Sequence, residues 1–209
     1  METSSVYLGR MVTVAEAMGK MGDEESRELA RGLRARDPGL LDRLIERYQY
    51  RLFRYLMFLT GRRETAEDLF QETWMRVLEK GNLYNARSRF EPWLFSIAHN
   101  LFIDMVRRNR SVVNLESVDC LEMNGHFPPA DTSSGVPADR LLRDEQNAIV
   151  ATALGRLPAG FREVLVLRFH EDLPLEEIAA VVGSPLPTVK SRLYRGLEKL
   201  REGLEGATS

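Results

Sequence analysis

The stretch LPLEEIAAVVGSPLPTVKSRLYR, residues 173–195, decides how the C-terminal part of the chain folds. A short apolar helix is predicted to end at Gly183, where the backbone needs a left-handed or open conformation. Ser184 is expected to cap the helix that follows. Pro185 and Pro187 fit the first turn of that second helix, because the N–H groups there have no helical partner. Together these features predict a helix-turn-helix.

The second helix of this motif has two distinct faces. Apolar residues at helical spacing form its inward stripe: Val189, Leu193, Leu197 and Leu200. Polar residues on the opposite side are placed to enter a major groove: Lys190, Ser191, Tyr194 and Arg195. Residues 185–201 carry five basic side chains against one acidic, although the whole chain has a formal net charge of -2. A solvated surface that complements its own helix dipole is the alternative, but the coincidence of all these features favours DNA binding.

Three further helices are predicted in the N-terminal half. Apolar residues recur every four positions from Leu40 to Leu56, and Gly61 is expected to end this first helix. A second helix is predicted over residues 64–80 and is closed by Gly81. The third, over about residues 91–110, is apolar around most of its circumference and is expected to be central. Trp93 and Trp74 are interpreted as core residues rather than as platforms for base stacking.

The predicted fold class is therefore all-α, with two small helical domains joined by a flexible acidic linker. The expected divisions are an N-terminal tail at 1–36, a helical domain at 37–111, a linker at 112–138 and a second helical domain at 139–205. Prolines and glycines break the helical periodicity in the linker. Residues 112–146 hold seven acidic side chains and two basic ones, so the tether is anionic.

The composition argues against several classes of protein. A single cysteine, Cys120, cannot form an internal disulfide, which is expected of a reduced cytoplasmic setting. The N-terminus shows neither a secretory leader nor a membrane span, so no membrane contact is expected. We find no nucleophile and base pair, no cluster with metal-ligand spacing and no glycine-rich phosphate loop. The sequence thus predicts a cytoplasmic protein that is not an enzyme and has no metal or other cofactor.

Two segments of the N-terminal half carry a family resemblance. AEDLFQETW at residues 66–74 and FEPWLFSIAHNLFID at residues 90–104 resemble region 2 of the sigma-70 family. The helix-turn-helix resembles region 4 of the same family, and only a linker lies between them. The whole chain therefore resembles an extracytoplasmic-function (ECF, group IV) sigma factor. Pro187 departs from the family pattern, which often has glycine just before Thr188, and this affects the entry angle of the recognition helix.

The resemblance implies roles for individual residues. Asp68, Gln71 and Glu72 match the face of region 2 that binds the clamp helices of the polymerase; spacing alone favours an ordinary solvated face. The loop 82–89 matches the segment that captures a flipped base of the minus-ten element. Candidates for contact with that element are Asn82, Tyr84, Asn85, Arg87 and Asn100, with Arg107, Arg108 and Arg110 on phosphates. Candidates for the minus-thirty-five element are Thr188, Lys190, Ser191, Arg192, Tyr194 and Arg195.

The implied partners are core RNA polymerase, through its clamp helices and flap, promoter DNA and an anti-sigma factor. The function implied is promoter recognition and DNA melting for a stress- or signal-responsive regulon. A stand-alone helix-turn-helix regulator with a helical sensor domain is the alternative. This alternative explains the C-terminal motif, but such a regulator would have no need of the polar face formed by Asp68, Gln71 and Glu72.

Overall fold

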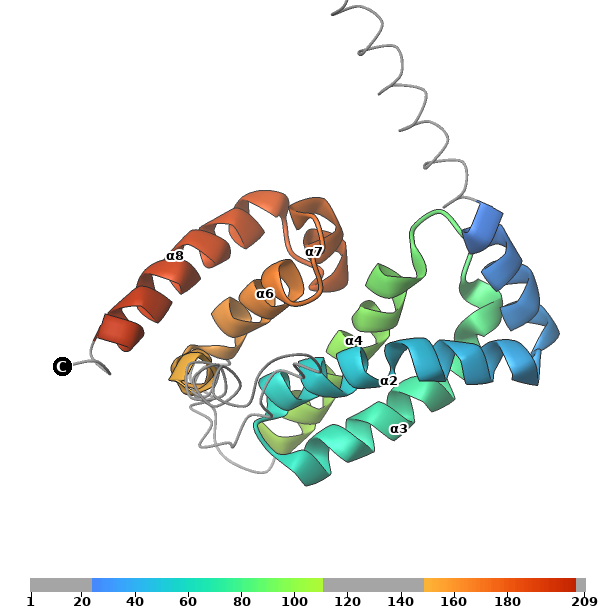
Figure 1. Cartoon of the computed structure of the whole chain (residues 1–209), viewed down its shortest axis with the longest axis horizontal. Coiled ribbons are helices and arrows are strands. Elements are labelled where there is room, and N and C mark those ends of the chain that lie inside the picture. The colour runs from blue at the N-terminus through green and yellow to red at the C-terminus, as the bar shows by residue number, and fades with distance from the viewer. Residues whose placement is uncertain (1–23, 111–148, 206–209) are drawn as a thin grey trace, which may run out of the picture.

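The computed structural model describes residues 24–110 and 149–205, and these residues form helices and no strand. Two groups of helices lie beside each other in Figure 1. The first unit, residues 24–110, contains α2 (Pro38–Thr60), α3 (Arg63–Lys80), the short 3₁₀ turn η1 (Gly81–Leu83) and α4 (Phe90–Arg110). The second unit, residues 149–205, contains α6 (Ala159–Phe169), α7 (Leu175–Val181) and α8 (Leu186–Glu205). The predicted all-α fold with two helical domains is confirmed, whereas the predicted linker at 112–138 lies outside the described residues.

Local signals explain both ends of α2. The side chain of Asp37 accepts a hydrogen bond from the backbone N–H of Gly39 at 3.0 Å, and Pro38 occupies the first turn. At the other end Gly61 adopts φ 63°, and its N–H donates to the carbonyl of Met57 at 2.8 Å. The helix is therefore held at Asp37 and Gly61 by the chain's own capping groups, as predicted for Gly61.

The core of the first unit lies between α2, α3 and α4. Its fully buried side chains come from all three helices and include Leu52, Tyr55, Leu56, Ala66, Val77, Leu94 and Phe95. The predicted central helix, α4, packs against both α2 and α3 and also touches α7 of the second unit. The sequence pattern thus identified the helix around which the unit is built.

Residues 24–35 form a helix that packs on the rest of the first unit, so the prediction of a tail over residues 1–36 was wrong for this part. Ala30 and Leu33 are buried in the core. The same packing bears on Gly81, which follows the last residue of α3 as predicted and has the ordinary helical φ of -57°. A Cβ atom on Gly81 would lie 3.2 Å from the Cβ of Leu33, so a side chain there would push the helix at residues 24–35 outward by a few tenths of an ångström. Residues 1–23 lie outside the described range.

The second unit contains the predicted helix-turn-helix. Gly183 adopts φ 58°, and the N–H of Ser184 donates to the carbonyl of Ala179 at 3.1 Å, which closes α7 in a Schellman arrangement. Ser184 does not cap α8 as predicted; its hydroxyl donates to the carbonyl of Val182 and accepts from Arg192. Val189 and Leu193 are buried as expected. Leu197, predicted on the same inward stripe, is 37% exposed, and Leu200 is only partly buried. The turn and the first half of the inward face therefore follow the sequence pattern, whereas the prediction was wrong for Leu197 because α8 runs past the helices that cover its first turns.

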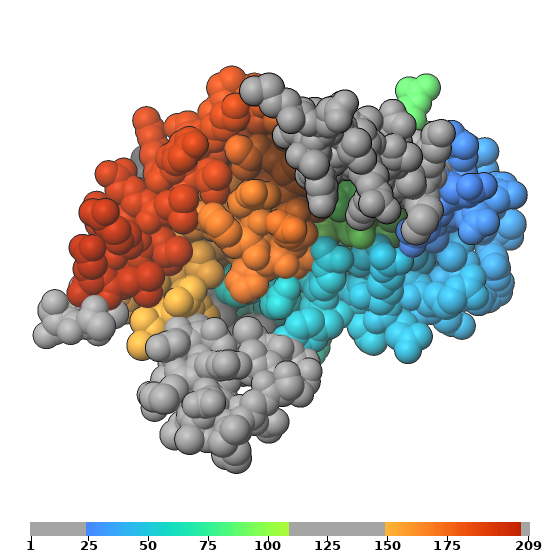
Figure 2. Space-filling model, turned by 45° about the horizontal axis from the view of Figure 1, so that its top comes forward, coloured from blue at the N-terminus to red at the C-terminus, as the bar shows by residue number. Residues whose placement is uncertain are grey.

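The two units touch each other, because α6 packs on α2 and α7 on α4. Figure 2 shows the orange surface around α6 meeting the cyan surface of α2. A helix long and apolar enough to cross a membrane does not occur in the parts of the chain described here.

Candidate nucleic-acid and protein interfaces

One exposed face of α3 carries the residues predicted to bind polymerase. Asp68, Gln71 and Glu72 are all exposed, on the side of the helix opposite the buried Ala66 and Val77. Their carboxylates and amide are therefore accessible to another molecule.

Two large apolar side chains, which the sequence reasoning missed, lie on the same face of α3. Met75 is 54% exposed, one turn beyond the predicted polar set, and Leu78 is 40% exposed, one turn further. The available signal was the spacing of Met75, which lies three residues after Glu72, with Leu78 three residues later still. An apolar pair bordered by charged residues is typical of a protein-binding surface.

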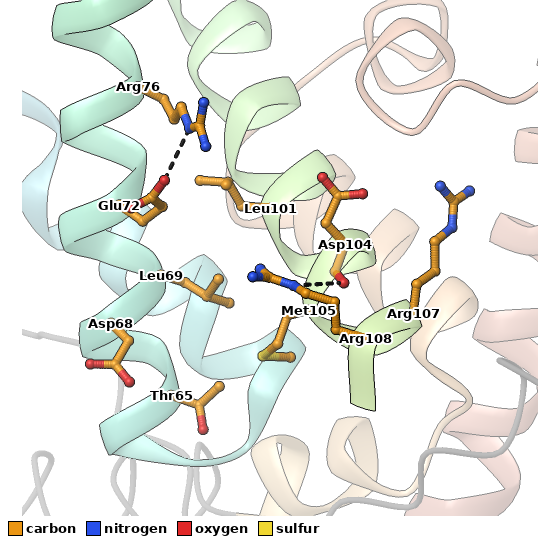
Figure 3. A pocket seen from close by; sticks show the side chains of 10 residues that line it. All are labelled: Thr65, Asp68, Leu69, Glu72, Arg76, Leu101, Asp104, Met105, Arg107 and Arg108. Carbon is orange, nitrogen blue, oxygen red and sulfur yellow. Dashed lines mark hydrogen bonds and ion pairs between the residues drawn. The ribbon is translucent and has the colours of Figure 1, made fainter. Parts of the chain in front are cut away.

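A groove of about 640 Å³ runs between α3 and α4, and Figure 3 shows the side chains that line it. Asp68 and Glu72 border it from α3, and Arg107 and Arg108 border it from α4. Within the groove Glu72 is paired with Arg76 at 3.0 Å. The acids predicted to bind polymerase and two of the arginines predicted to bind phosphate thus line one surface, which the sequence did not indicate.

Local interactions shape the loop at residues 82–89. The side chain of Asn85 accepts a hydrogen bond from the N–H of Arg87 at 3.1 Å, which closes a local turn. Ala86 adopts φ 58°, a left-handed conformation that costs a non-glycine residue free energy. Asn82, Asn85 and Arg87 are exposed. Three of the four loop residues predicted to meet a flipped base are therefore presented to solvent.

Tyr84 is the exception, since its side chain is buried. Its hydroxyl donates to the carbonyl of Ser88 at 2.8 Å, and its ring lies 5.2 Å from that of Trp93 and 5.8 Å from that of Phe90. Burial raises the pKa of the Tyr84 hydroxyl above its ordinary value. Tyr84 thus supports the loop from below rather than offering its ring to a base, and Trp93 packs against the core as predicted.

The residues expected to meet the minus-ten element do not form a single cluster. The loop precedes α4, whereas Arg107 and Arg108 are exposed at the far end of that helix, and Arg110 is its last residue. At 1.5 Å per residue the two ends are roughly 26 Å apart. Asn100 is exposed between them.

The outward face of α8 is as predicted. Lys190, Ser191, Tyr194 and Arg195 are exposed, and Tyr194 is 68% accessible. Gly196, on the inner side, allows α8 to pack closely on α6, since a Cβ there would lie 3.3 Å from the side chain of Leu165.

Thr188 and Arg192 are only partly exposed. Both line a hollow of about 530 Å³ between the start of α8 and the start of α6, bordered by Pro158 and Gly160. Arg192 also donates to the hydroxyl of Ser184 at 3.3 Å, so it braces the turn of the motif. In the described parts of the chain, no group of His, Cys, Asp and Glu side chains is arranged to hold a metal ion.

Comparison with known proteins gives a consistent result for both units. Residues 44–112 match the family model for sigma-70 region 2, and residues 153–202 match that for sigma-70 region 4. The ECF RNA polymerase sigma factor RpoE of Cereibacter sphaeroides is 30% identical over 80% of this chain and 87% of its own length. The ECF sigma factor SigE of Mycolicibacterium smegmatis is 37% identical over 78% of this chain, which spans 61% of that longer relative.

A solved structure supports the same assignment. The sigma factor RpoE, in complex with the anti-sigma factor NepR from Bartonella quintana, is similar with a TM-score of 0.60 and 26% identity. The similarity covers 78% of this chain and 96% of that one. Two matched regions in this order, on two helical units, define the sigma-70 class of transcription initiation factors, which are not enzymes.

Within that class, the chain belongs to the ECF sigma factors. Sigma factors of this group direct RNA polymerase to promoters. A stand-alone helix-turn-helix regulator would leave the match at residues 44–112 unexplained, so the comparisons do not support that alternative.

Proposed function

We propose that this chain binds core RNA polymerase through the exposed face of α3 and directs it to promoters. The first unit would read the minus-ten element and α8 would read the minus-thirty-five element. The proposal rests on the exposed face of α3. There the apolar side chains of Met75 and Leu78 are exposed beside the polar ones of Asp68, Gln71 and Glu72. Such a surface is unfavourable in water and favourable against a complementary partner.

The separation along α4 supports a division of labour at the minus-ten element. Asn82, Asn85 and Arg87 have the hydrogen-bonding groups that recognise an unstacked base, and they stand exposed on a shaped loop. Arg107 and Arg108 would contact DNA phosphates roughly 26 Å away, which is about eight base pairs of duplex. Arg110 is assigned to phosphates with them, and Asn100 lies between the two contacts.

The outward face of α8 supports recognition of the minus-thirty-five element. Lys190 and Arg195 are exposed and can each donate to a guanine edge or to phosphate. Ser191, Tyr194 and Thr188 would add contacts around them, and Arg192 would fix the turn from which α8 projects.

The proposal also includes where the protein acts in the cell and which partner inhibits it. The factor would act in the cytoplasm on a stress- or signal-responsive regulon, because sigma factors act on cytoplasmic polymerase. The RpoE of Bartonella quintana was solved with an anti-sigma factor, so we propose such an inhibitor for this chain as well.

Run-off transcription with core polymerase on a promoter library tests the proposal. Wild-type protein should produce specific transcripts, and Asp68→Asn and Leu78→Ala should each weaken binding to core polymerase roughly tenfold, as expected for interface residues worth about 1.4 kcal/mol. Glu46→Gln is the matched control, since Glu46 is an exposed carboxylate on α2 outside this face. A wild-type protein that neither binds core polymerase nor gives transcripts would overturn the proposal.

A further inference from the structure

Two buried glutamates of the second unit lie against the first unit. Glu163, only 5% exposed, accepts a hydrogen bond from the hydroxyl of Tyr55 at 2.5 Å and lies 2.7 Å from Nδ1 of His99. Glu171, 4% exposed, is paired with Arg51 at 2.7 Å and with Arg54 at 3.3 Å. Buried charges are stable only when paired and hydrogen-bonded, so these contacts fix how the units meet.

A third contact reaches the loop proposed to read the minus-ten element. Both guanidinium nitrogens of Arg89 that face α7 donate to Glu177, at 2.6 and 3.3 Å. Arg89 is the last residue of the loop at 82–89 and directly precedes α4. The loop is therefore tied to the helix-turn-helix in this arrangement.

The ion pairs of the interface share one polarity, although the buried Arg162 of the second unit also donates a hydrogen bond to the carbonyl of Phe58 in the first unit at 3.0 Å. In the described ranges 24–110 and 149–205, the three arginine–carboxylate pairs between the units all have the carboxylate on the second unit and the guanidinium on the first, and Glu163 of the second unit is hydrogen-bonded to His99 of the first. The second unit supplies Glu163, Glu171 and Glu177. The first unit supplies Arg51, Arg54, Arg89 and His99. A carboxylate and a phosphate oxygen satisfy a guanidinium in the same way, so this side of the first unit is chemically an anion-binding face.

The arrangement is incompatible with reading both promoter elements at once. Elements near positions minus ten and minus thirty-five are about 25 base pairs apart, which is roughly 85 Å of duplex. Here the loop and α7 are joined by an ion pair of 2.6 Å. The units must separate before both elements can be bound. Separation would uncover Arg54, whose side chain is 15% exposed here, and would release the partly exposed guanidinium groups of Arg51 and Arg89 from their carboxylate partners.

We propose that the second unit masks an arginine face of the first unit, formed by Arg51, Arg54 and Arg89, and that this face binds the DNA phosphate backbone beside the minus-ten element once the units separate. The inference rests on the proposed function. Continuity supports it, because Arg89 joins this face to the loop at 82–89. Glu171 and Glu177 therefore act as intramolecular competitors of DNA.

The test is DNA binding by the free, full-length protein. The probe is a fluorescent oligo(dT) of about 20 nucleotides, which carries phosphates and favours single-strand binding over recognition by α8. Glu171→Gln with Glu177→Gln should bind at least about tenfold more tightly than wild type. If three arginines gain phosphates, the slope of log affinity against log salt should steepen by about two.

Matched variants separate unmasking from a simple change in net charge. Asp172→Asn with Glu176→Gln removes two carboxylates from the same part of the second unit, where both residues are exposed, and should leave the affinity within about twofold. The double variant Glu171→Gln with Glu177→Gln is called the unmasked variant. Adding Arg51→Gln and Arg54→Gln to it should remove most of its gain in oligo(dT) affinity. If Asp172→Asn with Glu176→Gln increased the oligo(dT) affinity as much as the unmasked variant does, the proposal would be overturned.

A distance measurement tests separation directly. Spin labels at the exposed positions Glu46, which lies on α2 outside the polymerase-binding face, and Lys199, in a Cys120→Ser background, report the distance between the units. The distance should increase in the unmasked variant and on binding core polymerase. If Glu171→Gln unfolds the chain, Glu177→Gln alone remains informative, because the Arg89 pair lies at a partly exposed edge. Normal run-off transcription by wild type with unchanged distance and DNA affinity in Glu177→Gln would refute the masking and leave the proposed function intact.

Discussion

The two surfaces proposed to read DNA differ in what covers them. The outward side chains of α8, such as Lys190, Tyr194 and Arg195, are exposed although the units are in contact. At the other surface Arg89, beside the loop at 82–89, is held by Glu177 of α7. In the free chain the DNA-binding side chains of the second unit are therefore accessible, whereas part of the cationic surface of the first unit is paired with carboxylates of the second.

The largest effect should come from unfolding the second unit. Leu193 is buried on the inner face of α8, and Leu193→Ala should lower the free energy of unfolding by about 2–5 kcal/mol. Binding to a duplex selected by wild-type protein should be lost, while binding of oligo(dT) by the first unit should increase because its cover is released. Thermal unfolding and anisotropy measure the two effects. A parallel loss of both activities would show that the first unit depends on the second and is not masked by it.

The exposed face of α8 should behave alike in the free and the polymerase-bound chain. Lys190→Ala with Arg195→Ala should cost about 1–3 kcal/mol for each bidentate base contact removed. The same loss is expected with and without core polymerase, because nothing in the described chain covers either side chain. Arg201→Ala, in the last turn and paired with Glu205, is the control. A loss seen only with polymerase would mean that α8 is also held back in the free protein.

A smaller and local effect is expected at Tyr84. Tyr84→Phe removes the hydrogen bond to the carbonyl of Ser88 and should cost about 1 kcal/mol, since the partly buried Tyr84–Ser88 hydrogen bond is lost. Binding of oligo(dT) should fall a few-fold through a less ordered loop, and binding of α8 to duplex should stay unchanged. If Tyr84 instead stacks on a base, Phe would keep that ring and the affinity would not change.

Sequence patterns predicted those parts of the site whose causes are local. Gly183 and the faces of α8 and α3 follow from turn chemistry and helical spacing, which a few neighbouring residues determine. The buried position of Tyr84 could not be predicted, because its ring is enclosed by aromatic residues brought together by folding.

The contacts between the units could not be predicted from the sequence either, because folding brings their residues together from distant positions. Tyr55 and Glu163 are 108 positions apart, and Arg51 and Glu171 are 120 apart. Their pairing depends on how two units dock, and no periodicity records it. The sequence therefore predicted two DNA-binding domains joined by a linker, and the structure adds that the two units contact each other through ion pairs.

The smallest effect concerns the pH dependence of this contact. His170 of the second unit lies 5.2 Å from the ring of Phe58, and burial, followed by the nearby charge of Arg54, lowers its pKa below the ordinary 6.5. Because the joined state resists protonation, the separated state takes up the proton first as pH falls below 6.5. The contact should therefore be at full strength above pH 6.5 and weaken below it.

The spin-label distance, measured at about pH 7.5 and 5.5, checks this shift in population. Wild type should show more of the separated form at the lower pH, and His170→Phe, which keeps an aromatic ring against Phe58, should show a smaller change. His99→Gln is measured alongside, because His99 and Glu163 meet in the same interface. An unchanged pH response in His170→Phe would assign the effect to another group. Loss of the response would place His170 among the residues that hold the arginine face of the first unit covered near neutral pH.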